Sequence, residues 1–244
     1  MSEDLIGSIE DGALLEGEIT ADPQPAEETG EYSRRLPIYL LIDCSESMVG
    51  DPIAAIEEGL HTFLNDLQKD PIAVETVWLS VITFGTVARL IMPLTELKDF
   101  ELPHLEAGGA TYLGEAIRMV NSRIRQEVRK TSDCEKGDWK PMVYIFTDGD
   151  PNDEWTEAAK DFRNQKLASI IACGAGNEVQ DETLKVLSDK AVKLRDTAPA
   201  TLKGFVKYLT ASVSSKSRQL GSSAGAAEDY WQVSDEEMEI TIVT

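Results

Sequence analysis

LPIYLLIDCSES, residues 36–47, is the stretch that decides the fold and the candidate site. Its first part is almost entirely apolar, which is typical of a strand buried on both faces of a parallel sheet. The apolar run ends at Asp43, and Ser45 and Ser47 follow at alternating positions. Carboxylate and hydroxyl oxygens are the ligands that small divalent cations prefer. We therefore expect a buried strand with a metal-binding turn at its carboxyl end.

The rest of the chain alternates between strand-like and helix-like segments. Further apolar runs that resemble strands cover 74–84, 86–92, 142–147, 167–174 and 190–194. Apolar residues recur at helical spacing in 52–68, 113–129, 153–164, 181–188 and 199–213. This alternation predicts an α/β fold, a doubly wound, mostly parallel, Rossmann-like sheet with helices on both faces. Because only Gly85 separates 74–84 from 86–92, we expect one antiparallel edge strand there.

The negative charge of the chain is concentrated at its two ends. The formal net charge is -21, and sixteen acidic residues but no Lys or Arg lie before Arg34 and after Arg218. We expect a disordered acidic segment at 1–34, one domain at 35–217, and a linker with an acidic tail at 218–244. Residues 238–244 alternate like a final strand that adds to a sheet edge of this or another molecule.

Composition excludes several classes of partner. An acidic chain without a basic face does not suit nucleic acid or an anionic membrane surface. No run approaches the ~18 apolar residues of a membrane span, and the acidic N-terminus lacks the layout of a secretory signal. The cysteines at 44, 134 and 173 form no CxxC pair. Reduced thiols and a cytoplasmic location are therefore expected.

Two later segments have the ligands to complete a metal site with the first turn. Thr111 follows Gly108-Gly109, and Asp148 follows the apolar run 142–147. In an open parallel sheet, ligands bind beyond the carboxyl ends of the strands, so these loops should meet. Mg²⁺ is the expected ion because it retains waters and accepts few carboxylates, with Mn²⁺ and Ca²⁺ as alternatives. The expected site comprises Asp43, Ser45, Ser47, Thr111 and Asp148.

The order and spacing of these five residues resemble the metal-ion-dependent adhesion site of von Willebrand factor A domains. The resemblance implies that the hydroxyls of Ser45, Ser47 and Thr111 touch the ion directly. It implies that the carboxylates of Asp43 and Asp148 act largely through water. An ion held by neutral hydroxyls keeps its charge and an open position, which the Asp or Glu carboxylate of a protein partner would fill.

The resemblance covers about residues 36–215, and three segments within it narrow the family further. Residues 36–43, 48–53 and 147–151 are similar to the bacterial tellurite-resistance branch, the TerY type. This similarity implies a cytoplasmic stress-response assembly in which the A domain associates with a phosphatase and a kinase-like protein. Glu46 departs from the family, which often has Gly there, and is a possible modulator of the ion.

A binding protein, not an enzyme, is the expected function. Neither His61 nor His104 has a nucleophile near it in the sequence, so no catalytic triad is indicated. Three alternatives remain open: a capped turn without an ion, a metal-dependent phosphohydrolase, and a scaffold whose metal site is unoccupied. Because the site needs one more carboxylate, either acidic end of the chain is a further candidate ligand, in cis or on a neighbouring chain.

Overall fold

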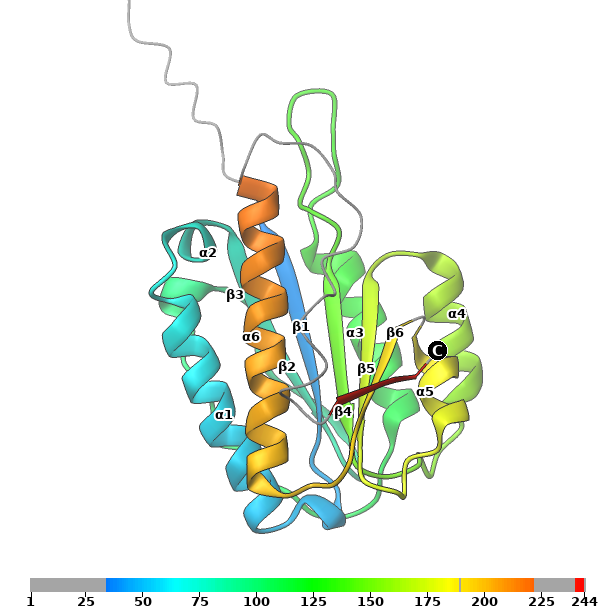
Figure 1. Ribbon diagram of the computed structural model, residues 1–244. Helices are drawn as coiled ribbons and strands as arrows, with labels where there is room; N and C mark the ends of the chain where they lie inside the picture. The colour runs from blue at the N-terminus through cyan, green and yellow to red at the C-terminus, as the bar shows by residue number, and fades with distance from the viewer. Residues whose placement is uncertain (1–33, 189, 222–239, 244) are drawn as a thin grey trace, which may run out of the picture. The chain divides into compact units, whose positions relative to one another are not determined.

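A seven-stranded sheet lies at the centre of the computed structural model, which describes residues 34–188, 190–221 and 240–243. The strand order is β3-β2-β1-β4-β5-β6-β7, with β4 in the middle of the sheet and β1 beside it (Figure 1). Strands β2, β1, β4, β5 and β6 run parallel, whereas β3 and β7 are antiparallel to their neighbours. The strand bounds are β1 Leu36–Asp43, β2 Val77–Phe84, β3 Ala88–Glu96, β4 Met142–Thr147, β5 Ser169–Ala175, β6 Lys190–Leu194 and β7 Ile240–Val243.

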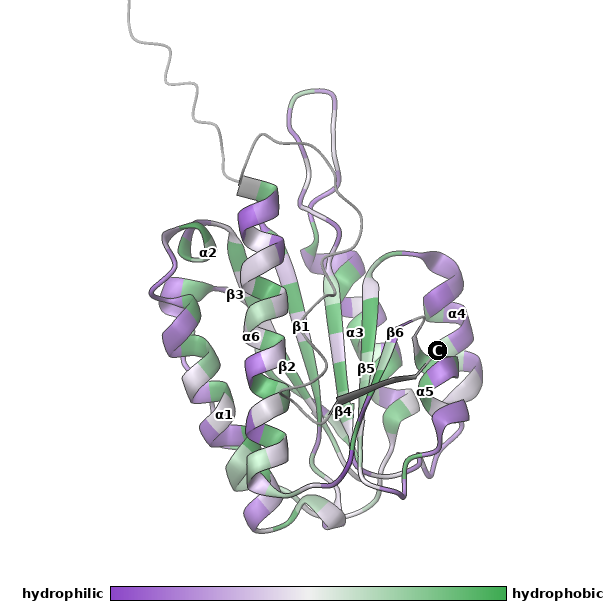
Figure 2. Cartoon of the chain, in the orientation of Figure 1, coloured by the Kyte–Doolittle hydropathy of each residue, from purple (hydrophilic) through white to green (hydrophobic). Residues whose placement is uncertain are grey.

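Helices cover both faces of the sheet because side chains of β1 alternate between two apolar cores. Ile38 and Leu40 belong to the core beneath α1 and α6, and Tyr39 and Leu41 belong to the core beneath α3, α4 and α5. Figure 2 shows largely hydrophobic strands between helices whose outer faces carry hydrophilic residues. The helix bounds are α1 Asp51–Leu67, α2 Pro71–Thr76, α3 Leu113–Glu127, α4 Thr156–Gln165, α5 Asp181–Leu187 and α6 Pro199–Gly221, with short 3-10 turns η1 Glu46–Met48 and η2 Leu97–Asp99.

The doubly wound fold expected from the sequence is confirmed, and so is the antiparallel edge strand that follows β2. The strand predicted at 74–84 begins later, because residues 71–76 form the helix α2. The Asp70 side chain accepts a hydrogen bond from Ile72 N, and Pro71 suits the first turn, so both residues favour a helix start.

The strand expected near the end of the chain lies at the opposite edge of the sheet. It pairs with β6 and gives the sheet a second antiparallel edge. The acidic segment expected to be disordered and most of the expected linker and acidic tail fall at 1–33 and 222–239, outside the described residues. Among the helices described, none has the length and apolar character needed to cross a bilayer.

Replacement of glycine by alanine should have opposite effects on stability at Gly59 in α1 and Gly204 in α6. A Cβ at Gly59 would lie 2.7 Å from Val206 Cγ2, whereas a Cβ at Gly204 would meet nothing within 4 Å. Gly59→Ala should lower the free energy of unfolding by about 1–2 kcal/mol through overpacking. Gly204→Ala should raise it by up to about 1 kcal/mol through helix propensity. Urea denaturation measures both, and equal effects would contradict this packing.

Candidate metal site

The candidate site lies where β1 and β4 end side by side. These strands are parallel neighbours, so the turns that follow Asp43 and Thr147 leave the same edge of the sheet. The chain continues from β1 to β2 on one side and pairs with β4 on the other, which makes this edge a switch point of the topology. The loop before α3 reaches the same edge, because Gly108 N donates to Cys44 O at 2.7 Å.

Three of the predicted residues form one hydrogen-bonded cluster. Ser47 Oγ donates to Asp148 Oδ1 at 2.7 Å, and Ser45 Oγ lies 3.1 Å from Ser47 Oγ. Ser45 and Asp148 are buried, whereas Ser47 is exposed. The cluster therefore opens to solvent on one side, which is the arrangement that a bound ion with a free position requires.

Asp43 lies beneath this cluster and is fully buried. Its Oδ1 accepts from Ser45 N at 2.8 Å, and its Oδ2 accepts from Thr147 Oγ1 at 2.6 Å. Burial raises the pKa of Asp43 to about 6, and nearby Asp148 adds to the rise, although the hydrogen bonds from Ser45 and Thr147 oppose it. Burial also raises the pKa of Asp148, against the bond from Ser47. Both carboxylates are thus held where a cation would stabilise their charged forms.

Thr111 lies beside the loop that carries Asp148. Its backbone N donates to Asn152 Oδ1 at 3.0 Å, and its carbonyl accepts from Asn152 N at 2.9 Å. A Cβ at Gly149 would come within 4.0 Å of Thr111 Oγ1. Within the described residues the Thr111 hydroxyl makes no hydrogen bond, so its oxygen is available as a ligand.

Glu46 is exposed, and its carboxylate is bound to the loop before α3. Its Oε2 accepts from Gly109 N at 3.2 Å, and its own N donates to Gly109 O at 2.9 Å. Gly109 has a φ of 86°, and a Cβ there would lie 2.0 Å from Thr86 Oγ1, so only glycine fits. The extra carboxylate therefore sits at the rim of the site, with one oxygen occupied by a backbone amide.

Sequence reasoning missed three residues that hold the site together. Thr147 bridges Asp43 and the Gly149 carbonyl, Asn152 holds Thr111, and Asp153 accepts from Gly114 N and Glu115 N at the start of α3. All three lie in the run 147–153, in which the sequence pattern predicts Asp148 alone as a site residue. Short polar side chains commonly bind nearby backbone amides, which is the signal that identifies such residues.

The donor set fits a hard divalent cation. The clustered atoms are hydroxyl and carboxylate oxygens, which suit Mg²⁺, Mn²⁺ or Ca²⁺. Among the described residues no group of three or more His, Cys, Asp or Glu side chains has metal-binding geometry, so a site of that kind is not formed there. Cys44 is buried, and burial raises the pKa of its thiol to about 12, which removes it as a thiolate ligand.

Solved structures with this fold include proteins of diverse origin. A von Willebrand factor type A protein from Catenulispora acidiphila is 17% identical, with a TM-score of 0.57 over 74% of this chain and 43% of that chain. The ArnB paralog VWA2 from Sulfolobus acidocaldarius is 19% identical, with a TM-score of 0.52 over 70% and 45%. Proximal thread matrix protein 1 from the mussel byssus, with a zinc-occupied MIDAS motif, is 15% identical, with a TM-score of 0.55 over 73% and 48%.

This chain spans less than half the length of each of these three structures, and their identities show the fold alone. No curated protein sequence matches the chain at a significant level. The model of the von Willebrand factor type A domain matches residues 38–207, which include all five predicted site residues. The chain therefore belongs to the von Willebrand factor type A domain family.

Proposed function

We propose that the protein is a divalent-ion-dependent protein-binding module, with Mg²⁺ as the ion. Ser45, Ser47 and Thr111 hold the ion directly, and Asp43 and Asp148 hold its waters. The hydrogen bond between Ser47 and Asp148 carries the proposal, because it joins the ends of two strands that lie 101 residues apart in the chain. A capped turn explains the Asp43–Ser45 contact, but it does not explain this long-range one.

The partner offers an Asp or Glu carboxylate in this proposal. The bound ion supplies the positive charge that attracts it. The chain's own residues leave most of that charge in place, because the three groups that hold the ion directly are neutral hydroxyls and the exposed one among them is Ser47. Thr147 donates to Asp43 Oδ2 and thereby fixes the orientation of the buried carboxylate. Glu46 is restrained by Gly109, which leaves the open position to the partner.

We further propose that the assembly is of the tellurite-resistance type and cytoplasmic, with a phosphatase and a kinase-like protein as partners. The similarity of the segments around Asp43 and Asp148 supports this, and the three free cysteines suit a reducing compartment. Affinity purification of the tagged protein with Mg²⁺ and with EDTA tests it. Recovery of such partners only with Mg²⁺ is expected, and equal recovery in both buffers would contradict it.

Binding without catalysis is also part of the proposal. His104 is exposed and its Nδ1 lies 3.0 Å from Glu57 Oε2, which raises the pKa of the imidazole and keeps it as a surface ion-pair partner. His61 is exposed on α1, and Cys44 is a buried thiol. Hydrolysis of a generic phosphoester that disappears in Asp43→Ala would favour the phosphohydrolase alternative instead.

Ser47→Ala should weaken Mg²⁺ binding by about tenfold or more, because it removes one ligand oxygen and the bond that positions Asp148. Isothermal titration calorimetry measures this directly. Ser47 is exposed, so the variant should fold normally. Thr62→Ala, which removes an exposed hydroxyl of α1, is the matched control and should bind Mg²⁺ as the unchanged protein does. Absence of binding by the unchanged protein would favour the scaffold with an unoccupied site.

A further inference from the structure

The mouth of the candidate site carries two exposed carboxylates, Glu46 and Glu178, which we name the rim glutamates. Glu46 is bound to Gly109 on one side of the mouth. Glu178 belongs to the loop after β5, and that loop reaches the site because Gln180 N donates to Asp150 Oδ1 at 3.1 Å. Glu178 also raises the pKa of Asp148 by its charge, and it makes no ion pair within the described residues.

The rim glutamates restrict which carboxylate can approach the ion. A purely acidic segment would bring its charges against both of them, and like-charge contacts disfavour binding. The residues before Arg34 and after Arg218 contain no Lys or Arg, so neither acidic end of the chain suits this mouth. A suitable ligand has an acidic residue flanked by basic ones.

One exposed loop of the same chain has that pattern. The loop 128–141 contains Asp133 and Glu135, the tip acids, between Lys130 and Lys136, the tip lysines. Residues 129–136 are all exposed, and within the described residues the tip acids make no ion pair. The loop connects the end of α3 to the start of β4, so it lies at the end of the sheet opposite the metal site, and Figure 1 shows it projecting beyond the strands.

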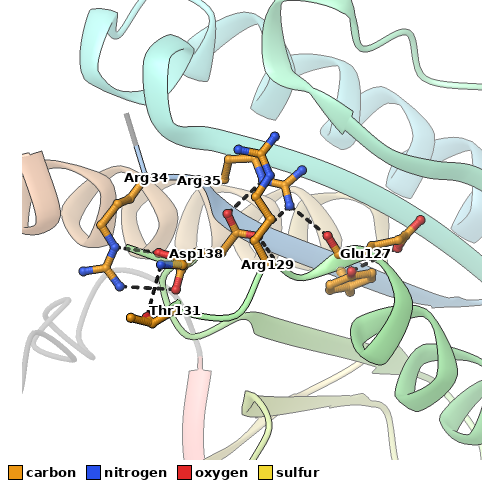
Figure 3. Close-up of polar contacts among 8 residues, drawn as sticks. Arg34, Arg35, Glu127, Arg129, Thr131 and Asp138 are labelled. Atoms are coloured by element: carbon orange, nitrogen blue, oxygen red, sulfur yellow. Dashed lines mark hydrogen bonds and ion pairs between the residues drawn. The ribbon is translucent and has the colours of Figure 1, made fainter. Parts of the chain in front are cut away.

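The base of this loop is clamped to the start of β1, as Figure 3 shows. Arg35 binds both carboxylate oxygens of Asp138, at 2.8 and 2.5 Å, and that carboxylate also accepts from Arg129 N at 2.7 Å. Arg34 donates to Gly137 O at 2.8 Å, and its guanidinium lies 3.6 Å from the centre of the Trp139 ring. These contacts fix both ends of the loop to the sheet.

The tip of the loop is shaped by its own hydrogen bonds. Ser132 N donates to Glu135 O at 2.9 Å, Glu135 N donates to Ser132 Oγ at 3.2 Å, and Gly137 N donates to Thr131 Oγ1 at 3.1 Å. A segment held in one conformation loses less entropy on binding than a flexible one. The loop therefore presents its acids and lysines as a preorganised ligand.

We propose that the loop 128–141 of one copy docks on the metal site of a second copy. A tip acid takes the open position at the ion, and the tip lysines pair with the rim glutamates. The inference rests on the proposed metal site. Because loop and site lie at opposite ends of the domain, the contact is head-to-tail, and it produces chains or rings instead of two-fold dimers.

Sedimentation velocity of the full chain in Mg²⁺ and in EDTA tests the docking, with reductant present because Cys134 is exposed. The weight-average mass should at least double in Mg²⁺ and return to that of the monomer in EDTA. Asp133→Asn/Glu135→Gln, the loop variant, should weaken association by about tenfold or more. Asp66→Asn/Glu75→Gln makes the same charge change elsewhere on the surface and should associate normally.

Mixing variants tests the head-to-tail arrangement. The loop variant retains the site, and Ser47→Ala, the site variant, retains the loop. At a protein and Mg²⁺ concentration where the unchanged protein just associates, each variant alone should stay monomeric, whereas an equal mixture should form a one-to-one dimer and nothing larger. A mixture that stays monomeric overturns the proposal, and so does a loop variant that still associates in Mg²⁺.

Calorimetry separates this inference from the proposed function. The loop variant should bind Mg²⁺ with the affinity of the unchanged protein, because the tip acids lie far from their own site. Mg²⁺ binding by a protein that remains monomeric overturns the docking and leaves the metal site standing. Failure of the unchanged protein to bind Mg²⁺ overturns the metal site itself.

Discussion

Asp43→Asn should stabilise the metal-free protein and abolish its stabilisation by Mg²⁺. The Asp43 carboxylate is fully buried, and burial raises its pKa to about 6. Keeping it charged at neutral pH therefore costs roughly 3 kcal/mol. An Asn side chain fits the same bonds, because its carbonyl accepts from Ser45 N and its amide faces Thr147 Oγ1. The Thr147 hydroxyl then donates only to Gly149 O, 2.9 Å away.

The pH dependence has a definite sign. Because folding raises the pKa of Asp43 from 3.8 to about 6, the folded state binds this proton more tightly than the unfolded state does. The contribution of Asp43 to stability therefore falls as pH rises from about 4 to about 6 and stays low above that range. The Asn variant lacks this fall. The difference in the free energy of unfolding between the two metal-free proteins should therefore be largest above pH 6.

Urea denaturation in EDTA and in Mg²⁺, at several pH values, measures these effects. Mg²⁺ should raise the free energy of unfolding of the unchanged protein and leave that of Asp43→Asn nearly constant. Asp161→Asn, on the exposed side of α4, is the control and should respond to Mg²⁺ normally. An Asn variant that is less stable in EDTA would show that the Asp43 charge is offset by some other group.

Arg35→Ala should strongly lower the free energy of unfolding. Arg35 is buried at the end of the sheet opposite the candidate metal site. Arg35 and Asp138 have side chains only 10% and 2% exposed, and their ion pair joins β1 to the loop 128–141. Arg35 also donates to Glu127 O at 2.8 Å and stacks 4.6 Å from the centre of the Trp78 ring. Removing one partner of a buried pair leaves the other uncompensated, so a loss of about 3–5 kcal/mol is expected.

Urea denaturation measures that loss, and limited trypsin digestion reports opening of the loop through cleavage at Lys130 or Lys136. Lys69→Ala breaks an exposed pair, 75% and 49% exposed, and is the control; it should cost less than about 1 kcal/mol. If Arg35→Ala lowered the free energy of unfolding as little as Lys69→Ala does, the contacts of Arg35 would not be what holds the loop. The variant should also lose metal-dependent association if the loop is the docking element.

The sequence predicted the fold because its signals are local and repeated. The continuous apolar run of β1 marks a strand buried on both faces, and the helical spacings in 52–68 and 113–129 mark helices that cover it. Reliance on such local signals also placed the start of β2 three residues too early, at 74 instead of 77. Val74 is part of an apolar run, yet the helix-start signals of Asp70 and Pro71 prevailed, and residues 71–76 became α2.

For the candidate site, only the residue types and their positions along the chain could be predicted. The alternating hydroxyls after Asp43, together with Thr111 and Asp148, indicate a cation site from residue type and order alone. The supporting bonds from Thr147 and Asn152 were missed because short polar side chains at a turn have many possible partners. The direction of the Glu46 carboxylate depended on Gly109, which is 63 residues away.

By itself, the sequence of residues 36–47 determined a buried central strand that ends in hydroxyl and carboxylate oxygens, because burial and ligand chemistry are properties of the residues themselves. Only the tertiary structure decided that Ser47 meets Asp148, that the Glu46 carboxylate is held by Gly109, and that Arg35 clamps Asp138. These contacts join residues 63 to 103 positions apart, and such pairs meet only when the sheet has set the order and register of its strands.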